Sequence, residues 1–295
     1  MSFKSGFVTI IGRPNVGKST LMNDIVGRKI AITSPKPQTT RHLITGIITN
    51  ENYQLVFVDT PGMHKGKNLL GKKINNLAID SLKGMDAIIF MVDKERGFAE
   101  DHIINHFKET NKPVFLVINK IDLVKGKMGI DKIILSYINN YDYAAVIPIS
   151  AKDNQNIDHL IDALVPFLKE GPMYYPKEMD SDQTDEKLMS EIVREKILFH
   201  TEEEVPHSVA VLIEHLEENA ETKTLDVSAI IVVERDSQKG ILIGNKGERL
   251  KKIGTEARKD LNKTLGRKIH LSLFVKVNKD WRSNINELKK YGIGD

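Results

Sequence analysis

Residues 12–19 read GRPNVGKS and match the pattern G-x-x-x-x-G-K-[ST], the signature of a phosphate-binding loop, or P-loop. The apolar run FVTIIG precedes the loop and a helical pattern follows it, so a strand–loop–helix unit is predicted. Glycines allow backbone N–H groups to converge on phosphate oxygens, which the N-terminus of the helix also favours. In this pattern Lys18 is expected to reach the β- and γ-phosphates, while Ser19 offers its hydroxyl to Mg²⁺.

Residues 7–168 alternate short Val- and Ile-rich runs with helical patterns such as KSTLMNDIVG and NIDHLIDALVPFLK. Strands that are buried on both faces show continuous apolar runs, so the predicted class is α/β with a mostly parallel sheet. Ligands of such sheets bind at the carboxyl ends of the strands. The P-loop lies at such an end, in a nucleotide-binding domain that is predicted to span residues 1–170.

The second part of the chain has a different pattern. Residues 171–186 hold two prolines, a glycine and several acids, and therefore predict a surface linker. Residues 187–295 then show a helix, two alternating strands, a second glycine loop, a basic helix, a strand and a final helix. This order predicts a smaller α+β domain.

Composition restricts both the chemistry and the partners. The 295 residues include no cysteine, which excludes a disulfide framework, a cysteine-ligated zinc and a thiol nucleophile, and fits a cytoplasmic protein. No run of about 18 apolar residues occurs, so the only membrane contact that remains possible is peripheral association.

The charges are distributed unevenly along the second part of the chain. Residues 178–236 hold 17 Asp or Glu and 5 Lys or Arg, whereas residues 239–295 hold 15 Lys or Arg and 6 Asp or Glu. Such charge runs are usually solvated faces, but a basic block with a glycine loop favours a polyanionic partner.

Residues 59–62, DTPG, end a predicted strand close to the phosphates. The Asp59 carboxylate suits a Mg²⁺ ion that it holds through water, and Gly62 can present its N–H to the γ-phosphate. Taken alone, the four residues also fit an ordinary turn. Their position after a P-loop favours the metal site.

Two loops are predicted to be switches that the γ-phosphate orders and hydrolysis releases. Residues 34–42, SPKPQTTRH, contain Thr39 and Thr40, of which Thr40 is preferred as a Mg²⁺ ligand. The alternative is a surface loop whose threonines have no role. Residues 62–68, GMHKGKN, form the second predicted switch.

Residues 119–122, NKID, follow the run VFLVI and indicate a guanine base. The Asp122 carboxylate can accept hydrogen bonds from N1–H and the N2 amine of guanine, a donor pair that adenine lacks. The stem of Lys120 can cover the base, and Asn119 is expected to tie this loop to the P-loop. Residues 150–152, SAK, can then give a backbone N–H to guanine O6.

These motifs together resemble the translation-factor-like GTPases. The stretch QTTRH at residues 38–42 and the C-terminal architecture resemble the bacterial ribosome-assembly GTPases among them, and the likeness covers essentially the whole chain. The residues expected at GTP or GDP are Gly12, Arg13, Pro14, Asn15, Val16, Gly17, Lys18, Ser19, Thr20, Asp59, Thr60, Pro61, Gly62, Met63, Asn119, Lys120, Asp122, Ser150, Ala151 and Lys152. The residues expected to act in hydrolysis are Asn15, Lys18, Thr40 and Gly62.

The residue that orients the attacking water is not evident. Ras-type enzymes place a glutamine after the Asp-x-x-Gly motif, whereas this chain has Met63, which is expected to pack rather than to bind water. The neighbouring His64 is expected to be solvated. In related GTPases with a hydrophobic residue here, an asparagine at the position of Asn15 helps to hold K⁺. The resemblance therefore implies slow hydrolysis that K⁺ stimulates.

The second glycine loop lies in GILIGNKGERLKKIG, residues 240–254. It has no Lys-Ser/Thr pair after its last glycine, so it is not a second P-loop. The G-x-x-G of residues 244–247 also fits a helix stop, but after two strands it resembles a type II KH domain, which clamps roughly four single-stranded nucleotides. The residues expected at RNA are Ile243, Gly244, Asn245, Lys246, Gly247, Arg249, Leu250 and Lys251.

The leading hypothesis is a monomeric, GTP-switched protein that binds the 3′ end of 16S rRNA and acts on the 30S ribosomal subunit. The alternative is a GTPase switch at the membrane surface, or in cell-cycle control, whose basic domain meets a lipid or a protein. An ATP-dependent kinase is a third class, which Asn119 and Asp122 disfavour. Trp281 and Tyr291 can stack on bases, although packing of the terminal helix is preferred.

Overall fold

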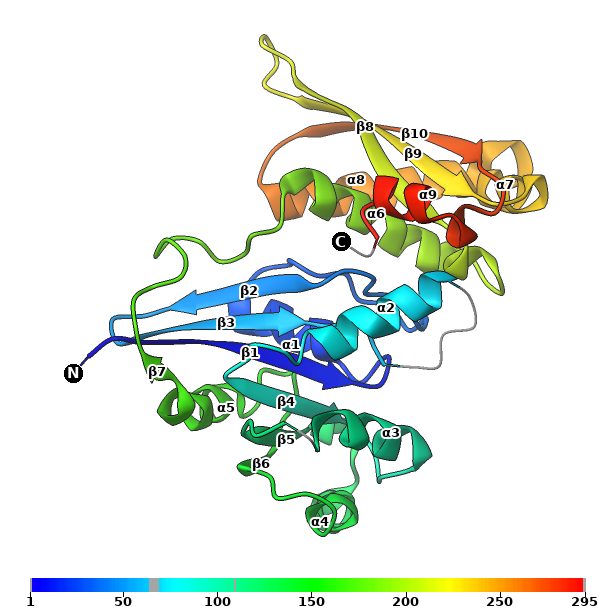
Figure 1. Cartoon of the computed structure of the whole chain (residues 1–295). Helices are drawn as coiled ribbons and strands as arrows, with labels where there is room; N and C mark the ends of the chain where they lie inside the picture. The colour runs from blue at the N-terminus through cyan, green and yellow to red at the C-terminus, as the bar shows by residue number, and fades with distance from the viewer. Residues whose placement is uncertain (1, 64–68, 109, 294–295) are drawn as a thin grey trace. The chain divides into compact units, whose positions relative to one another are not determined.

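Figure 1 shows the computed structural model of the chain, which describes residues 2–63, 69–108 and 110–293. By its internal contacts the chain forms two compact units. The first unit holds most of residues 2–182, and the second holds residues 183–293 together with Ile32–Thr39 and residues 69–70. The second predicted switch, including His64, lies outside the described residues except for its first two members.

The first unit is built on a seven-stranded sheet with the order β2-β3-β1-β4-β5-β6, and β7 pairs with β1. The strands are β1 (Lys4–Gly12), β2 (Ile44–Thr49), β3 (Tyr53–Asp59), β4 (Ala87–Val92), β5 (Val114–Ile118), β6 (Ala145–Pro148) and β7 (Lys169–Glu170). Neighbours are parallel except for β2 with β3 and β7 with β1. The predicted mostly parallel sheet is confirmed.

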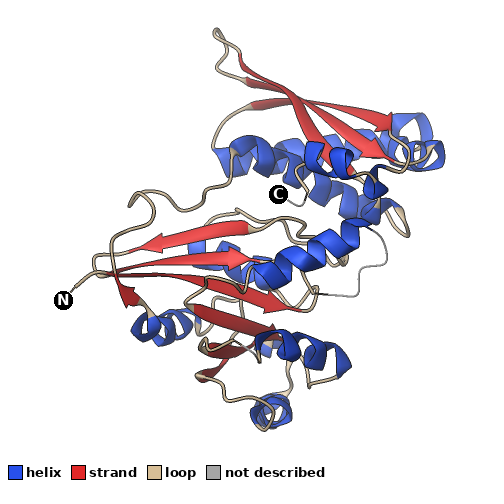
Figure 2. Cartoon of the chain, viewed as in Figure 1, coloured by secondary structure: helices blue, strands red, loops and turns tan. Residues whose placement is uncertain are grey.

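Helices cover both faces of this sheet (Figure 2). The helices are α1 (Lys18–Val26), α2 (Leu69–Asp80), α3 (Phe98–Phe107), α4 (Gly126–Ile138) and α5 (Ile157–Leu164). Successive side chains of a strand point to opposite faces, so Ile10 packs with α1 and α5, while Ile11 packs with α2, α3 and α4. This two-sided burial is why the strands are continuously apolar, and every residue of β4 is buried.

Residues 171–182 belong to the first unit, although the sequence predicts a linker there. The fully buried Gln54 of β3 accepts a hydrogen bond of 2.7 Å from the Tyr174 N–H and donates one of 2.9 Å to the Tyr175 carbonyl. The N–H of Ile47 in β2 donates to the Asp180 carbonyl at 2.8 Å. The sheet therefore satisfies the polar backbone of this segment, which prolines and acids alone do not reveal.

The second unit is built on a three-stranded sheet. Its elements are α6 (Asp185–His200), β8 (Ala210–Glu218), β9 (Leu225–Val233), α7 (Asp236–Ile243), α8 (Glu248–Leu265), β10 (Ile269–Val277) and α9 (Ile285–Lys290). The sheet order is β10-β9-β8, with β9 parallel to β10 and antiparallel to β8. Alternate residues of β9, such as Ile231, pack against Val193 of α6 and Ile253 of α8. The predicted α+β domain is confirmed.

Among the described residues, no helix is both long enough and apolar enough to cross a membrane.

Candidate functional site

The P-loop lies between β1 and α1, with its lysine folded inside it. Lys18 is buried, and its Nζ donates to the carbonyls of Gly12 and Arg13 at 3.3 and 3.0 Å. Burial lowers the pKa of Lys18 to about 8, although the Asp59 carboxylate opposes the shift. The ammonium therefore lies where the loop carbonyls converge and where phosphate oxygens are expected.

Three predicted metal-site side chains lie together beside the P-loop. The hydroxyl of Ser19 donates to Oδ2 of Asp59 at 2.6 Å and lies 3.0 Å from the hydroxyl of Thr40. The neighbouring Thr39 instead donates to the Lys36 carbonyl at 2.7 Å. Of the two threonines, only Thr40 therefore contacts the other predicted metal-site residues in the described structure.

Asp59 is fully buried, and its Oδ1 has no hydrogen-bond partner among the described residues. Burial raises the pKa of Asp59 to about 6, while Lys18 and the hydrogen bond from Ser19 oppose that rise. A buried carboxylate oxygen without a donor, next to two hydroxyls, suits a hard cation or its water ligands. The residues thus fit Mg²⁺.

The DTPG turn packs onto the P-loop rather than into solvent. The Thr60 hydroxyl donates to the Ile10 carbonyl at 2.7 Å, and Gly62 lies against Pro14. Met63 is 3% exposed and belongs to the core cluster that contains Ile11. Its thioether is therefore packed into this core, and the side chain offers no group that orients water.

A cavity of about 260 Å³ lies where the NKID loop meets the P-loop. It is lined by Gly17, Thr20, Asn119, Lys120, Asp122, Leu123 and Lys152. The motifs predicted all of these residues except Leu123, which is 72% exposed. In the sequence, Leu123 can be identified as the apolar residue directly after the NKID motif.

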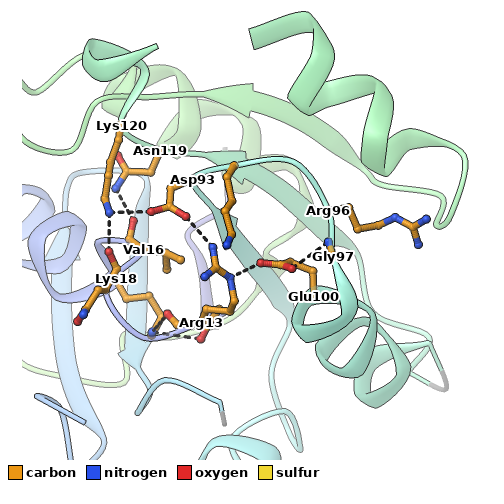
Figure 3. Close-up of polar contacts among 12 residues, drawn as sticks. Arg13, Val16, Lys18, Asp93, Arg96, Gly97, Glu100, Asn119 and Lys120 are labelled. Atoms are coloured by element: carbon orange, nitrogen blue, oxygen red, sulfur yellow. Dashed lines mark hydrogen bonds and ion pairs between the residues drawn. The ribbon is translucent and has the colours of Figure 1, made fainter. Parts of the chain in front are cut away.

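Asn119 connects three loops around this cavity. Its Nδ2 donates to the Val16 carbonyl at 2.8 Å, the predicted tie to the P-loop (Figure 3). Its Oδ1 accepts from the Ala151 N–H at 2.9 Å. In this structure the Ala151 N–H thus has an acceptor in Asn119, while the contact of a backbone N–H of residues 150–152 with guanine O6 stays a prediction. The Ser150 hydroxyl donates to Oδ1 of Asp122 at 2.8 Å, which orients the carboxylate that is expected to bind guanine.

The first predicted switch is divided between the two units. Within the second unit, the Thr33 N–H donates to Glu195 at 2.9 Å, and the buried Arg194 donates to the Thr39 carbonyl. Thr40, the next residue, groups with the first unit. Sequence patterns did not predict this division, because it depends on contacts between residues more than 150 positions apart.

The second glycine loop stands between α7 and α8 with positive φ angles at Gly244, Lys246 and Gly247. Beside it lies a groove of about 470 Å³. Its lining residues are Gly247, Leu250, Lys251, Gly254, Thr255, Arg258, Leu271 and Leu273.

Only some of the predicted RNA residues line this groove. Gly247, Leu250 and Lys251 line it, whereas the guanidinium of Arg249 binds the Ile241 carbonyl. The missed residues of α8 continue one helical face, since residues 254, 255 and 258 follow 247, 250 and 251 at steps of three or four. That periodicity can be found in the sequence. Leu271 and Leu273 come from β10, and only the topology brings them to the groove.

Trp281 and Tyr291 pack within the second unit. Trp281 is fully buried, its indole N–H donates to the Ser208 carbonyl at 3.1 Å, and its ring centre lies 5.3 Å from that of Tyr291. The preferred interpretation of these aromatic residues as packing side chains is therefore confirmed.

Comparisons with known proteins agree with both halves of the chain. Residues 7–120 match the family described as a 50S ribosome-binding GTPase, and residues 204–282 match the KH domain family. The two matches lie in the first and the second unit, respectively.

Two solved structures match almost the entire chain. A variant of Era from Aquifex aeolicus bound to GDP and AlF4⁻ is 38% identical, with a TM-score of 0.94 over 98% of this chain and 99% of that one. Era in complex with MgGDPNP and nucleotides 1506–1542 of 16S ribosomal RNA is 39% identical, with the same TM-score and coverage. Since the likeness extends through both domains at this identity, the chain belongs to the Era family of GTPases.

Proposed function

We propose that this chain is a GTP-hydrolysing switch that binds the single-stranded 3′ end of 16S rRNA and acts in 30S subunit assembly and rRNA maturation. The proposal rests on the likeness to an Era structure that holds MgGDPNP and 16S rRNA nucleotides. That protein is 39% identical to this chain, and the match covers 98% of this chain. The nucleotide cavity and the G-x-x-G groove are the corresponding features of this chain. Its place of action would be the cytoplasm.

In the first unit each group has a separate task. Lys18 neutralises phosphate charge, the Asp122 carboxylate selects guanine, and Gly62 offers its N–H to the γ-phosphate. Ser19 and Thr40 would hold Mg²⁺ directly, and Asp59 would hold it through water. When bound, Mg²⁺ stabilises the negative charge that develops on the phosphates.

For hydrolysis, Met63 supplies neither a group that orients water nor positive charge. The proposed source of charge is a K⁺ ion held with the help of Asn15, an exposed P-loop residue with a φ of 63°, and this ion would take the role of an arginine finger. Turnover is expected to be several-fold faster in KCl than in NaCl of equal ionic strength. The Asn15→Ala variant should lose this difference, and equal turnover of the unaltered chain in both salts would exclude the idea.

In the second unit the groove provides an apolar wall and two cations. Leu250, Leu271 and Leu273 offer surfaces on which bases can rest, while Lys251 and Arg258 can pair with phosphates. No heavy atom of the described residues lies within 4 Å of a Cβ built at Gly247, so an RNA backbone has room to approach.

The RNA assignment is tested with a single-stranded oligonucleotide of the 16S 3′ end. Gly247→Asp adds bulk and negative charge at the loop and is expected to weaken binding by at least about tenfold. Gly266→Asp is the matched control, because Gly266 has a φ of 64°, is similarly open, and caps the opposite end of α8. Equal RNA affinity of the two variants would contradict the assignment.

A membrane or protein partner of the basic domain remains the competing proposal. A G-x-x-G loop is not needed for lipid binding, whereas charge alone fits both. Vesicles with anionic lipid, tested with the same two variants, separate the proposals. Tight vesicle binding that Gly247→Asp does not change, together with no RNA binding, would favour the membrane.

A further inference from the structure

Asp93, a carboxylate outside the nucleotide motifs, connects the two loops of the guanine cavity. Asp93 directly follows β4, and its Oδ1 accepts a hydrogen bond of 2.9 Å from Nη2 of Arg13 in the P-loop. Its Oδ2 accepts one of 2.7 Å from Nζ of Lys120 in the NKID loop. Figure 3 shows the carboxylate between these two cations. A single side chain thus contacts residues from two separate sequence motifs.

Lys120 is held by two acceptors. Besides Asp93, its Nζ donates to the Asn15 carbonyl at 2.6 Å, while Lys120 itself lines the cavity together with Asp122. Its side chain is 34% exposed, so without fixed partners a long lysine would sample many rotamers. The two acceptors restrict the ammonium to the P-loop and leave the aliphatic stem at the cavity wall.

Arg13 and Glu100 hold the Asp93 carboxylate in turn. The Arg13 guanidinium pairs with both Asp93 and Glu100, and Glu100 is 2% exposed. Oε2 of Glu100 accepts from the Gly97 N–H at 3.0 Å, at the start of α3. Two carboxylates therefore balance two cations, and the Arg13 side chain is attached to α3.

The segment after β4 is also fixed by α4. The buried Tyr137 donates from its hydroxyl to the Lys94 carbonyl at 3.0 Å, and the Ser136 hydroxyl accepts from the Arg96 N–H at 3.0 Å. These contacts preorganise the backbone next to Asp93. A side chain supported in this way can set the geometry of its partners with little loss of entropy.

We propose that Asp93 is a positioning residue for guanine-nucleotide binding, which acts by fixing Lys120 at the cavity wall. The inference rests on the proposed function, because it requires GTP or GDP in this cavity. Asp93→Asn keeps the shape of the side chain but replaces one carboxylate oxygen with a donor that repels a neighbouring cation. The dissociation constant for GDP is expected to rise about tenfold, as for one lost charge-assisted hydrogen bond. The KM for GTP should rise by a larger factor than kcat falls.

A double-mutant cycle tests whether Asp93 acts through Lys120. A fluorescent GDP analogue is titrated into the full chain and into the Asp93→Asn, Lys120→Met and double variants. The tenfold effect of Asp93→Asn should shrink to less than about twofold when Lys120 is already Met. An equal effect in both backgrounds would overturn the proposal.

Asp101→Asn is the matched control. It removes a carboxylate from the first turn of α3, one that pairs with Arg96 at 2.6 Å, and Asp101 does not line the cavity. This variant is expected to bind GDP as the unaltered chain does. Asp93→Glu keeps the charge and should restore most of the affinity, which a purely structural defect of Asp93→Asn would not predict.

The outcomes separate this inference from the proposed function. If the unaltered chain binds no guanine nucleotide, both fail. If it binds GDP and Asp93→Asn binds equally well, only the positioning role of Asp93 fails. If Asp93→Asn does not fold, Asp93→Ser takes its place in the cycle, and the same coupling with Lys120 is required.

Discussion

The two glycine loops of this protein differ in what surrounds their last glycine. At Gly17 a Cβ would lie 2.2 Å from Nδ2 of Asn119, because the NKID loop closes onto the P-loop there. At Gly247 a Cβ would meet no described heavy atom within 4 Å. At Gly17 a side chain would collide with Asn119 of the same protein. At Gly247 the absence of a side chain leaves space for a ligand backbone. Two loops of similar composition thus differ in the space beside their last glycine.

The comparison predicts its largest effect for Gly17→Ala. The φ of 105° at this position costs an L-residue roughly 1–3 kcal/mol, and displacement of Asn119 breaks its bonds to Val16 and Ala151. Together these losses should weaken GDP binding by at least about 100-fold, measured by fluorescent nucleotide titration. Gly27→Ala is the control, since Gly27 has a φ of 77° but no close neighbour among the described residues. Similar GDP affinity in both variants would contradict the inference that close packing against Asn119 makes glycine necessary at position 17.

A medium effect is expected for Arg258→Ala in the groove. Loss of one phosphate-pairing cation should weaken RNA binding about three- to tenfold and reduce the slope of log K against log salt by about 1. The measurement is a salt series of RNA titrations. Arg267→Ala, which removes a cation paired with Glu218 away from the groove, should leave the slope unchanged. An unchanged slope for Arg258→Ala would remove that residue from the RNA surface.

The smallest effect is expected for Gly247→Ala. A methyl group there meets open space, so only the backbone strain of roughly 1–2 kcal/mol at a φ of 81° remains. RNA affinity should fall less than about fivefold, and thermal unfolding should shift by only a few degrees. A loss as large as that of Gly17→Ala would show that the loop is closely packed after all.

Much of the nucleotide site was predictable because its motifs are short and local. The loop that leads to Lys18 follows β1, Asp59 ends β3, and the loop that holds Asn119 and Asp122 follows β5. Parallel strands end at one edge of the sheet, which brings these residues together. The assignment of residues 171–182 as a linker was less successful, because the buried Gln54 that holds them lies on β3, about 120 residues earlier. The likeness to Era came from the same short motifs and the order of elements.

Local chemistry was therefore determined by the sequence alone: the P-loop, the guanine motif, the parallel sheet, and the type of each domain. The tertiary structure decided which side chains support these motifs and where neighbouring residues belong. Asp93 lies 27 residues before Lys120 and 80 after Arg13, and no periodicity relates the three. Thr39 and Thr40 are adjacent, yet their contacts assign them to different units. The physical reason is that hydrogen bonds and ion pairs depend on distance in space, which the packing of β4, α3 and α4 sets only after the chain has folded.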